Sequence, residues 1–352
     1  MTAHLEYTYS TRDVRVVFGI GSLATLDGEL NALGVRRVLL VATPGRTTAV
    51  AVMRDLLGPR LGETFAGARQ HVPVEVVRVA LEAVHRVNAD AIVSFGGGSA
   101  VGLGKALARE TSLPLIAVPT TYAGSEMTSI WGTSEGGEKR TGRDPRVAPR
   151  LVLYDPELTL DLPASTSAAS GMNAIAHCVE ALYARDANPV SLLLAEDGLR
   201  RLAASLSRIV AVPADVRARS DALTGAHLAG RALDLTTMGL HHKLCHVLGG
   251  LGLPHAETHA ALLPHVVAFN APAAPEAMSR ICAAIGAVSA GDGLAALSEA
   301  LGTRRPLSAL GLQRADIPRA AALAAASSAQ GNPRAATEDE VRALLERAMV
   351  LG

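Results

Sequence analysis

The chain has 352 residues, which exceeds one typical domain, so two packed domains are expected. Hydrophobic residues make up 49% of it, enough for sizeable cores, and 33 Lys and Arg balance 33 Asp and Glu. The formal charge is therefore zero and no basic tract is present, which argues against nucleic acid or an anionic membrane as the main partner.

The sequence also predicts a cytoplasmic location. No apolar run reaches the length of a membrane span, and the N-terminus lacks the apolar core of a signal peptide. The three cysteines, Cys178, Cys245 and Cys282, are odd in number and widely spaced. This pattern predicts reduced thiols used in packing rather than a disulfide framework.

Strands and helices alternate through the first half of the chain. Arg37–Ala42 (RVLLVA) and Ala89–Phe95 (ADAIVSF) are continuous apolar runs, typical of strands buried on both faces of a parallel sheet. This alternation predicts an α/β, doubly wound, Rossmann-like domain. The expected strands are 14–18, 37–42, 89–95 and 115–118, the expected helices are 23–33, 47–57, 74–87 and 103–108, and a hairpin closed at Gly136-Gly137 is expected over 128–141.

A glycine-rich turn follows the predicted strand at 89–95. Its residues, Gly96, Gly97, Gly98 and Ser99, stand where a doubly wound sheet binds phosphate. Glycines let the backbone approach an anion closely, and the free N–H groups at the start of the next helix supply positive potential. A tight turn without a ligand uses the same residues, but the strand–turn–helix context favours a cofactor-binding turn.

A second polar turn follows the predicted strand at 115–118. Thr120, Thr121 and Ser125 are expected to line the same crevice and to reach the ribose or the nicotinamide amide of a dinucleotide. The alternative is an ordinary hydroxyl-rich turn that caps the next element.

The end of the strand at 37–42 bears on the choice of cofactor. Thr43 and Arg46 follow this strand, and no carboxylate does. An acidic residue at this place bonds the ribose hydroxyls and repels a 2′-phosphate. Its absence predicts that NADH is used and that NADPH is tolerated.

The second half of the chain carries apolar positions at helical spacing throughout. The clearest helices are 164–182, 190–210, 216–233 and an alanine-rich stretch at 320–328. The alternation of strands and helices stops near Asp161–Pro163. We therefore expect a dinucleotide-binding α/β domain at 1–160 and an all-α domain, carrying substrate and catalytic groups, at 161–352.

Histidines gather in one short stretch of this second half. His242 and His246 are four residues apart, so on a helix they project from one face, and the glycines at 249–252 with Pro254 end that helix before His255. Gathered imidazoles suit a metal site or a pocket that handles protons near neutral pH. Six of the chain's 11 histidines lie between Gly239 and His265: His241, His242, His246, His255, His259 and His265. For His241, His259 and His265 packing is the expected role.

Several motifs together resemble the iron-containing alcohol dehydrogenase superfamily, which has a dehydroquinate synthase-like fold, and within it the maleylacetate reductase branch. The resemblance runs nearly from end to end and implies a nicotinamide-binding N-terminal domain, a helical C-terminal domain, an active site in the cleft between them and a homodimer. The motifs are FGGGSAVGLGK (95–105), PTTYAGSEMT (119–128), DPELTLDLP (155–163), SGMNAIAHCVEALY (170–183), LHHKLCHVLGG (240–250), LPHAETHAALLPH (253–265) and NPRAATEDEVRALL (332–345).

The resemblance also bears on metal binding. In metal-dependent members an aspartate and three histidines hold the ion, and the matching positions here are Asn173, His177, His242 and His255. Asn173 replaces the carboxylate with a neutral amide, which binds transition metals more weakly. Metal dependence is therefore not carried over, and a metal-free or weakly occupied iron or zinc site is expected. Gly102 also stands where alcohol dehydrogenases of the wider family carry aspartate.

The implied reaction is reduction of the carbon–carbon double bond of maleylacetate to 3-oxoadipate by NADH or NADPH, a step in the catabolism of aromatic compounds. Such a reaction needs a donor to the ketone oxygen and an acid for the adjacent carbon. His246 or His242 is assigned to these tasks, with His177 and Asn173 shaping the pocket. The candidates for binding the dicarboxylate substrate are Tyr122, Lys243 and His255, against the alternative of a packed tyrosine and a surface lysine.

Three other interpretations stay open at this point. The first is a reductase on the same scaffold that acts on another enone, keto acid or aldehyde. The second is a dehydroquinate synthase-like lyase, which needs a firmly held metal and more substrate-binding lysines and arginines than this chain shows. The third is a binding or structural protein without activity, which the cofactor turns and the histidine cluster argue against.

Overall fold

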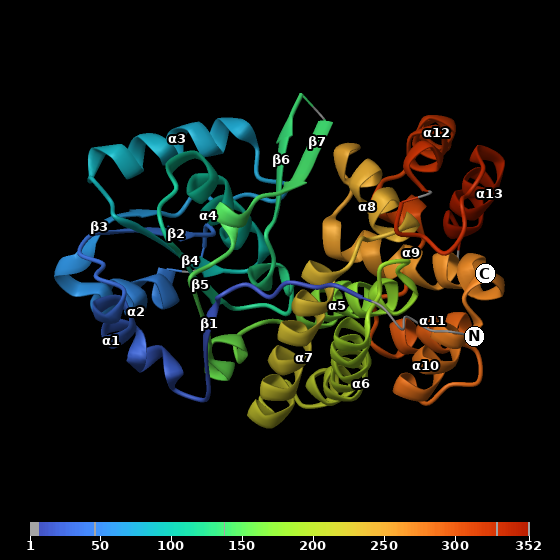
Figure 1. Ribbon diagram of the computed structural model, residues 1–352, viewed down its shortest axis with the longest axis horizontal. Coiled ribbons are helices and arrows are strands. Elements are labelled where there is room, and N and C mark those ends of the chain that lie inside the picture. The colour runs from blue at the N-terminus through green and yellow to red at the C-terminus, as the bar shows by residue number, and fades with distance from the viewer. Residues whose placement is uncertain (1–6, 46, 137, 329, 351–352) are drawn as a thin grey trace. The chain divides into compact units, whose positions relative to one another are not determined.

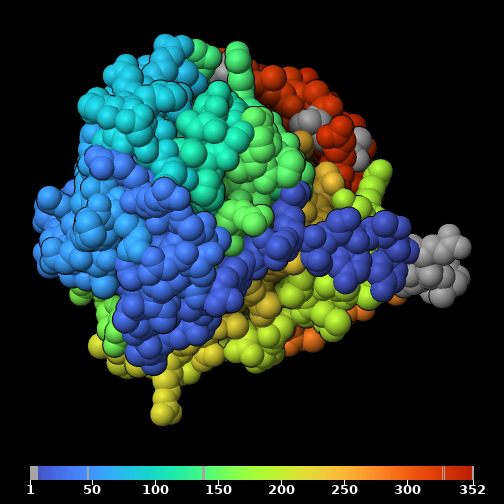
Figure 2. All heavy atoms as spheres, turned by 60° about the vertical axis from the view of Figure 1, so that its left-hand side comes forward, coloured from blue at the N-terminus to red at the C-terminus, as the bar shows by residue number. Residues whose placement is uncertain are grey.

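The computed structural model describes residues 7–45, 47–136, 138–328 and 330–350, and it divides into two compact units (Figure 1). The N-terminal unit is Arg12–Leu162. The helical unit comprises the described residues from Pro163 onward, together with residues 7–11. Figure 2 shows one face of the molecule, with the side chains of the N-terminal unit in blue to green.

A six-stranded sheet forms the centre of the N-terminal unit, and every neighbouring pair of its strands is parallel. The chain places β2 beside β3 and then β4 on the other side of β2, so the winding direction reverses between β2 and β4. Doubly wound sheets bind their ligands at such a reversal, beyond the carboxyl ends of the strands. In spatial order the strands are β1 (Arg15–Phe18), β8 (Leu151–Tyr154), β5 (Leu115–Pro119), β4 (Ala91–Gly96), β2 (Val38–Ala42) and β3 (Leu61–Phe65).

Helices cover both faces of this sheet. Side chains alternate across a strand, so Leu40 and Val93 face one layer of helices while Leu39 and Ile92 face the other. The first core includes residues of α1 and α2, and the second includes residues of α3 and α4. These helices are α1 (Leu26–Ala32), α2 (Thr47–Leu57), α3 (Val74–Arg86) and α4 (Gly98–Thr111).

The predicted strands and helices of the N-terminal unit are present, and the structure has two further strands, β3 and β8, that the sequence did not predict. The hairpin forms as an antiparallel pair of β6 (Ile130–Glu135) and β7 (Glu138–Arg143), although Gly137 itself lies outside the described residues. The sequence reading missed β3, an edge strand whose side chains are all half-buried, because LGETF lacks a continuous apolar run. It also missed β8, which is only four residues long. The helix expected at 103–108 begins earlier, at Gly98.

From residue 163 to residue 350 the described chain forms only helices and turns. Its central helix is α5, in which every residue from Ser167 to Tyr183 is buried. Polar side chains on α5 are therefore placed inside the unit, where each needs a partner. The helices are α5 (Ala164–Tyr183), α6 (Pro189–Ala211), α7 (Val216–Leu235), α8 (Leu240–Gly250), α9 (His255–Asn270), α10 (Pro275–Ile285), α11 (Ala290–Ala300), α12 (Ile317–Ser327) and α13 (Glu338–Ala348).

One stretch of the described chain, 275–300, has the length and apolar composition of a membrane span, with a mean hydropathy of 1.5. The sequence reading expected no such run. The stretch is two helices, α10 and α11, because Gly286 ends α10 in the left-handed conformation with φ 68°. A single apolar stretch of this kind is weak support for a membrane protein, and here the helix is interrupted at its middle.

Candidate active site

The predicted cofactor residues gather at one edge of the sheet. Gly96, the last residue of β4, pairs in register with Pro119, the last residue of β5, and Ala42 of β2 pairs with Phe95. The glycine turn, the hydroxyl turn and Thr43 therefore follow three neighbouring parallel strands and emerge at the same carboxyl edge. This edge includes the reversal between β2 and β4. Arg46 lies outside the described residues.

Close packing between the two turns accounts for the glycine at position 97. Gly97 is the N-cap of α4, and a Cβ on it would lie 2.8 Å from Cγ2 of Thr121. Gly96 has φ 145°, a conformation that only glycine adopts readily. The first N–H groups of α4, at Gly98 and Ser99, have no partner within the helix and carry the positive end of its dipole. This backbone cradle fits the phosphates of a dinucleotide.

A buried lysine holds the hydroxyl turn in place. Nζ of Lys105, on α4, donates to Oγ1 of Thr128 at 2.8 Å and to the carbonyl of Ile130 at 2.9 Å, and it also bonds the carbonyl of Ser125. The lysine is 2% exposed. It therefore ties the segment that follows β5 to the helix that follows β4. Gly102, one turn earlier on α4, packs so closely that a Cβ would lie 2.8 Å from Val72.

Tyr122 lies inside the N-terminal unit. Its ring is fully buried and its hydroxyl donates to Oγ1 of Thr159 at 3.4 Å. A second tyrosine, Tyr154, donates to the buried carboxylate of Glu126 at 2.8 Å. Burial raises the pKa of Glu126 above its usual value, because the charged form is poorly solvated there. Both tyrosines thus anchor the hydroxyl turn to the segment around β8.

The helical unit brings together six histidines from three helices. His177 comes from α5, while α8 supplies His241, His242 and His246, and α9 begins with His255 and carries His259 one turn later. Gly252, with φ 91°, and Pro254 separate α8 from α9 as the sequence predicted. The side chains of His177, His241, His242 and His259 are buried, whereas His246, His255 and Lys243 are partly exposed. His265 is not among the ring contacts of this cluster.

His259 lies at the centre of the cluster. Its ring centroid is 4.5 Å from that of His255, 4.8 Å from those of His241 and His242, and 6.3 Å from that of His177. The rings of His177 and His242 are 5.1 Å apart. Burial lowers the pKa of His177 and of His259 well below the usual value, so both rings are neutral at pH 7.

Glu180 organises the start of α8, and sequence reasoning missed it. Its carboxylate, on fully buried α5, accepts the backbone N–H of His241 at 3.0 Å and of His242 at 3.3 Å. Gly239, the N-cap of α8, has no side chain that could do this. The same carboxylate accepts a hydrogen bond from Nδ1 of His242, which fixes the tautomer of that ring with its proton on Nδ1. Burial raises the pKa of Glu180, and the N–H groups of α8 oppose that rise.

Asn332 supports the same helix end from the far end of the sequence. Its Oδ1 accepts the N–H of Leu240 at 3.2 Å, and it exchanges two amide hydrogen bonds of 2.9 Å with Asn270, the last residue of α9. Gly331, with φ 75°, packs so closely that a Cβ would lie 2.3 Å from the carbonyl oxygen of Thr237. Asn332, the first residue of the motif at 332–345, thus holds the start of α8 against the end of α9, and we call this contact the clamp at Asn332.

The four positions that the resemblance links to an ion do not form a strong metal site here. Asn173 supplies an amide where a carboxylate would be expected. Two groups of described side chains have ligand atoms within 4.8 Å of one another: Glu180, His241 and His242, and His241, Cys245 and His259. Neither group contains His177 or His255. An amide in place of the carboxylate weakens this donor set for a divalent transition metal, so the chemistry below is derived without one.

Known proteins resemble this chain along nearly its whole length. The family model for iron-containing alcohol dehydrogenase matches residues 13–156, and the model for the C-terminal part of the Fe-containing alcohol dehydrogenase family matches residues 167–349. Maleylacetate reductase of Burkholderia cepacia is 49% identical over 343 residues, 97% of each chain. The crystal structure of maleylacetate reductase from a Rhizobium species matches with a TM-score of 0.91 at 45% identity and 98% coverage of both chains. A putative alcohol dehydrogenase from Ralstonia eutropha matches with a TM-score of 0.95 at 49% identity, covering 97% of this chain and 98% of that one.

Proposed function

Because the chain belongs to the iron-containing alcohol dehydrogenase family, we propose that it is an oxidoreductase that reduces the carbon–carbon double bond of maleylacetate to give 3-oxoadipate. The observation that carries this proposal is near-complete similarity to several proteins named maleylacetate reductase, at 44% to 49% identity. The parallel sheet and the helical unit are those of this family.

The reaction sets three physical demands. A reduced nicotinamide supplies hydride to the carbon β to the ketone when it is bound. Negative charge then develops on the ketone oxygen, which needs a hydrogen-bond donor. The adjacent carbon must receive a proton from an acid of suitable pKa. A ketone conjugated to the double bond and flanked by carboxylates is already electrophilic, so the lost aspartate is a smaller handicap here than in alcohol oxidation.

His242 and His246 are our candidates for the donor and the acid. A carboxylate at Nδ1 fixes the tautomer and orientation of a histidine and stabilises its imidazolium form, and Glu180 supplies that carboxylate to His242. His246 lies one turn further on α8, with its ring centroid 6.3 Å from that of His242, and it is partly exposed. His177 and Asn173, one turn apart on α5, shape the wall beside them.

Lys243 and His255 are our candidates for the carboxylates of the substrate. Both are partly exposed and stand beside the cluster on α8 and α9. Tyr122 is a weaker candidate, because its hydroxyl already bonds Thr159 and its ring is fully buried.

The turns at the carboxyl edge of the sheet are our candidates for the nicotinamide dinucleotide. Gly96, Gly97, Gly98 and Ser99 would hold the phosphates, and Thr120, Thr121, Ser125 and Thr43 would line the same edge. With no carboxylate after β2, NADH and NADPH are both expected to serve. Steady-state kinetics with each cofactor checks this, and a preference for NADH above about a thousandfold, roughly 4 kcal/mol, would refute it.

We further propose that the protein is a cytoplasmic homodimer, as the family resemblance implies. Light scattering on the purified protein measures its mass directly, and a monomeric mass at micromolar concentration contradicts the dimer.

The decisive test of the function follows NADH absorbance with maleylacetate, before and after chelation, with identification of the product. We expect oxidation of one NADH per 3-oxoadipate formed, at a rate that chelation leaves unchanged. A panel of other enones, keto acids and simple aldehydes is the control. Faster turnover of any panel member than of maleylacetate would move the substrate assignment to that compound.

A further inference from the structure

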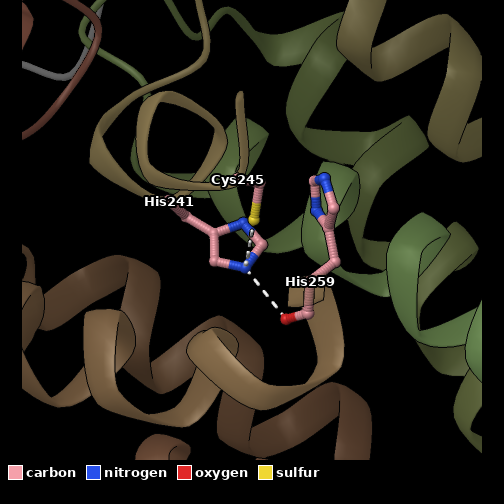
Figure 3. A group of neighbouring side chains, drawn as sticks. All are labelled: His241, Cys245 and His259. Carbon is pink, nitrogen blue, oxygen red and sulfur yellow. Dashed lines mark hydrogen bonds between the residues drawn. The ribbon is translucent and has the colours of Figure 1, made fainter. Parts of the chain in front are cut away.

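His241, Cys245 and His259 form a compact group inside the helical unit (Figure 3). His241 and Cys245 are four residues apart on α8 and so share one face, and His259 approaches them from α9. One ligand atom from each residue, a ring nitrogen or the sulfur, lies within 4.8 Å of the other two. All three side chains are fully buried. None of them is used in the reaction proposed above.

The hydrogen bond of His241 fixes its tautomer. Nε2 of His241 lies 3.0 Å from the backbone carbonyl oxygen of His259 and 3.9 Å from Sγ of Cys245 (Figure 3). A carbonyl oxygen only accepts, so Nε2 carries the ring proton and Nδ1 carries the lone pair. Within the described chain Nδ1 has no hydrogen-bond partner. Histidines that bind metals show this arrangement, in which the second ring nitrogen donates to a carbonyl.

His259 is the least satisfied member of the group. Neither of its ring nitrogens has a hydrogen-bond partner among the described residues, although the side chain is fully buried. A neutral imidazole has one donor and one acceptor, and leaving either unsatisfied in the interior is destabilising, because its hydrogen bonds to water are lost without replacement. Such a group in a folded protein points to an ion or a water that completes it.

We propose that His241, Cys245 and His259 bind a divalent transition metal such as zinc through two neutral imidazoles and one thiolate. Nitrogen and sulfur together are the donors that zinc prefers, and three protein ligands leave one tetrahedral position for a further ligand. On binding, the metal–sulfur bond replaces the S–H bond and the proton passes to solvent, so no oxidant or reductant is needed.

This site shares no residue with Asn173, His177, His242 and His255, the positions at which the family resemblance places an ion. The neighbouring group of Glu180, His241 and His242 is a poorer host, because its carboxylate already holds two N–H groups of α8 and Nδ1 of His242. A metal on His241, Cys245 and His259 ties α8 to α9, the two helices that present the proposed acid and substrate residues. The inference does not depend on the reductase assignment, because its readouts do not use activity.

Cobalt spectroscopy tests the site directly. The full-length protein is produced in cobalt-supplemented medium, so that the ion is present while the buried site folds. We expect one equivalent of cobalt and a thiolate-to-cobalt charge-transfer band in the near ultraviolet. Cys245→Ser should abolish the band and His259→Gln should weaken cobalt binding by at least about tenfold. The matched control is Cys178→Ser, which alters the other fully buried thiol of this unit and should leave the band intact.

Three results would overturn the proposal. One is wild-type protein that holds no cobalt and no zinc by elemental analysis. Another is bound cobalt without a thiolate band. The third is a band that survives Cys245→Ser, or one that is lost in His255→Gln but kept in His259→Gln, because this places the ion at the family position. Far-ultraviolet circular dichroism confirms that each variant is folded, and Cys245→Ala repeats the test if the serine variant is not.

Discussion

The cofactor edge of the N-terminal unit and the histidine cluster of the helical unit are built in opposite ways. At the proposed cofactor edge, the expected binding groups are backbone N–H groups of short consecutive segments, and the sequence contributes mainly by leaving side chains out, as at Gly97. In the cluster, side chains from three helices meet, and each depends on a partner distant in sequence, such as Glu180 for His242. A substitution that adds a side-chain atom should therefore disrupt the cofactor edge, whereas a substitution that removes a hydrogen-bonding group should disrupt the histidine cluster.

The largest effect is expected from Glu180→Gln. The substitution removes a buried carboxylate that accepts hydrogen bonds from two N–H groups of α8 and from Nδ1 of His242. A hydrogen bond to a charged group contributes about 1.5–3 kcal/mol, and the glutamine amide can replace only part of the three that Glu180 accepts, so chemical denaturation should register a loss of at least that size along with a fall in turnover. The control is Glu196→Gln, which breaks a half-exposed ion pair with Arg280 and should cost less than about 1 kcal/mol. Equal losses of unfolding free energy in both variants would show that the hydrogen bonds of Glu180 contribute no more to stability than a half-exposed ion pair.

His246→Ala should separate catalysis from cofactor binding. We expect turnover to fall about 10²- to 10⁴-fold, the usual contribution of a general acid, while NADH affinity stays within a few-fold of wild type. The matched control is His265→Ala, on α9 but outside the cluster of rings. Unchanged turnover in the His246 variant would remove this residue from the proposed mechanism and leave His242.

Gly97→Ala tests the cofactor edge by addition. The new Cβ would lie 2.8 Å from Cγ2 of Thr121, an overlap that should cost about 1–3 kcal/mol and raise the KM for NADH. Adding Thr121→Ser removes that methyl group but keeps the hydroxyl oxygen, which lies 3.0 Å from the new Cβ, and should recover part of the loss. Gly98→Ala places its Cβ an ordinary 3.8 Å from Ala123 and should not destabilise the fold. If the serine brings no recovery, the clash with Thr121 is not the cause.

A smaller effect concerns pH. Burial, and after it the charge of Arg231, lower the pKa of His227 on α7 to about 4, from the ordinary histidine value of about 6.5. Below pH 6.5 the unfolded chain binds a proton that the folded chain refuses, so stability is lost as pH falls from 6.5 toward 4, by about 1.4 kcal/mol per pH unit. His227→Gln should reduce the slope of the unfolding free energy against pH by this contribution, while the buried His177, His241 and His259, whose pKa values are also lowered, keep theirs. His85→Gln, at an exposed position on α3, should leave the slope intact.

Much of the fold can be predicted from local sequence patterns. The helix at 47–57 and the strand at 37–42 are visible because their apolar spacing is set by their own burial. The strand β3 was missed because a half-buried edge strand has no such spacing. In the candidate site, the paired histidines are recognisable from their spacing in the sequence. Glu180 and Asn332 are not, because they accept backbone N–H groups of α8 that lie 61 and 92 residues away in sequence. A lone acidic residue one turn after His177, in a helix otherwise apolar around it, was the available signal for Glu180.

The clamp at Asn332 has a consequence for the order in which the chain is completed on the ribosome. The N-terminal unit has all its strands once Tyr154 has emerged, because β8 is the last of them. The helix that carries His241, His242 and His246 must wait a further 92 residues beyond its own first residue before the side chain that receives the N–H of Leu240 is synthesised. The N-terminal unit can thus mature during translation while the helical unit is still incomplete, so termination before residue 332 would spare the sheet and leave the N–H of Leu240 without its acceptor.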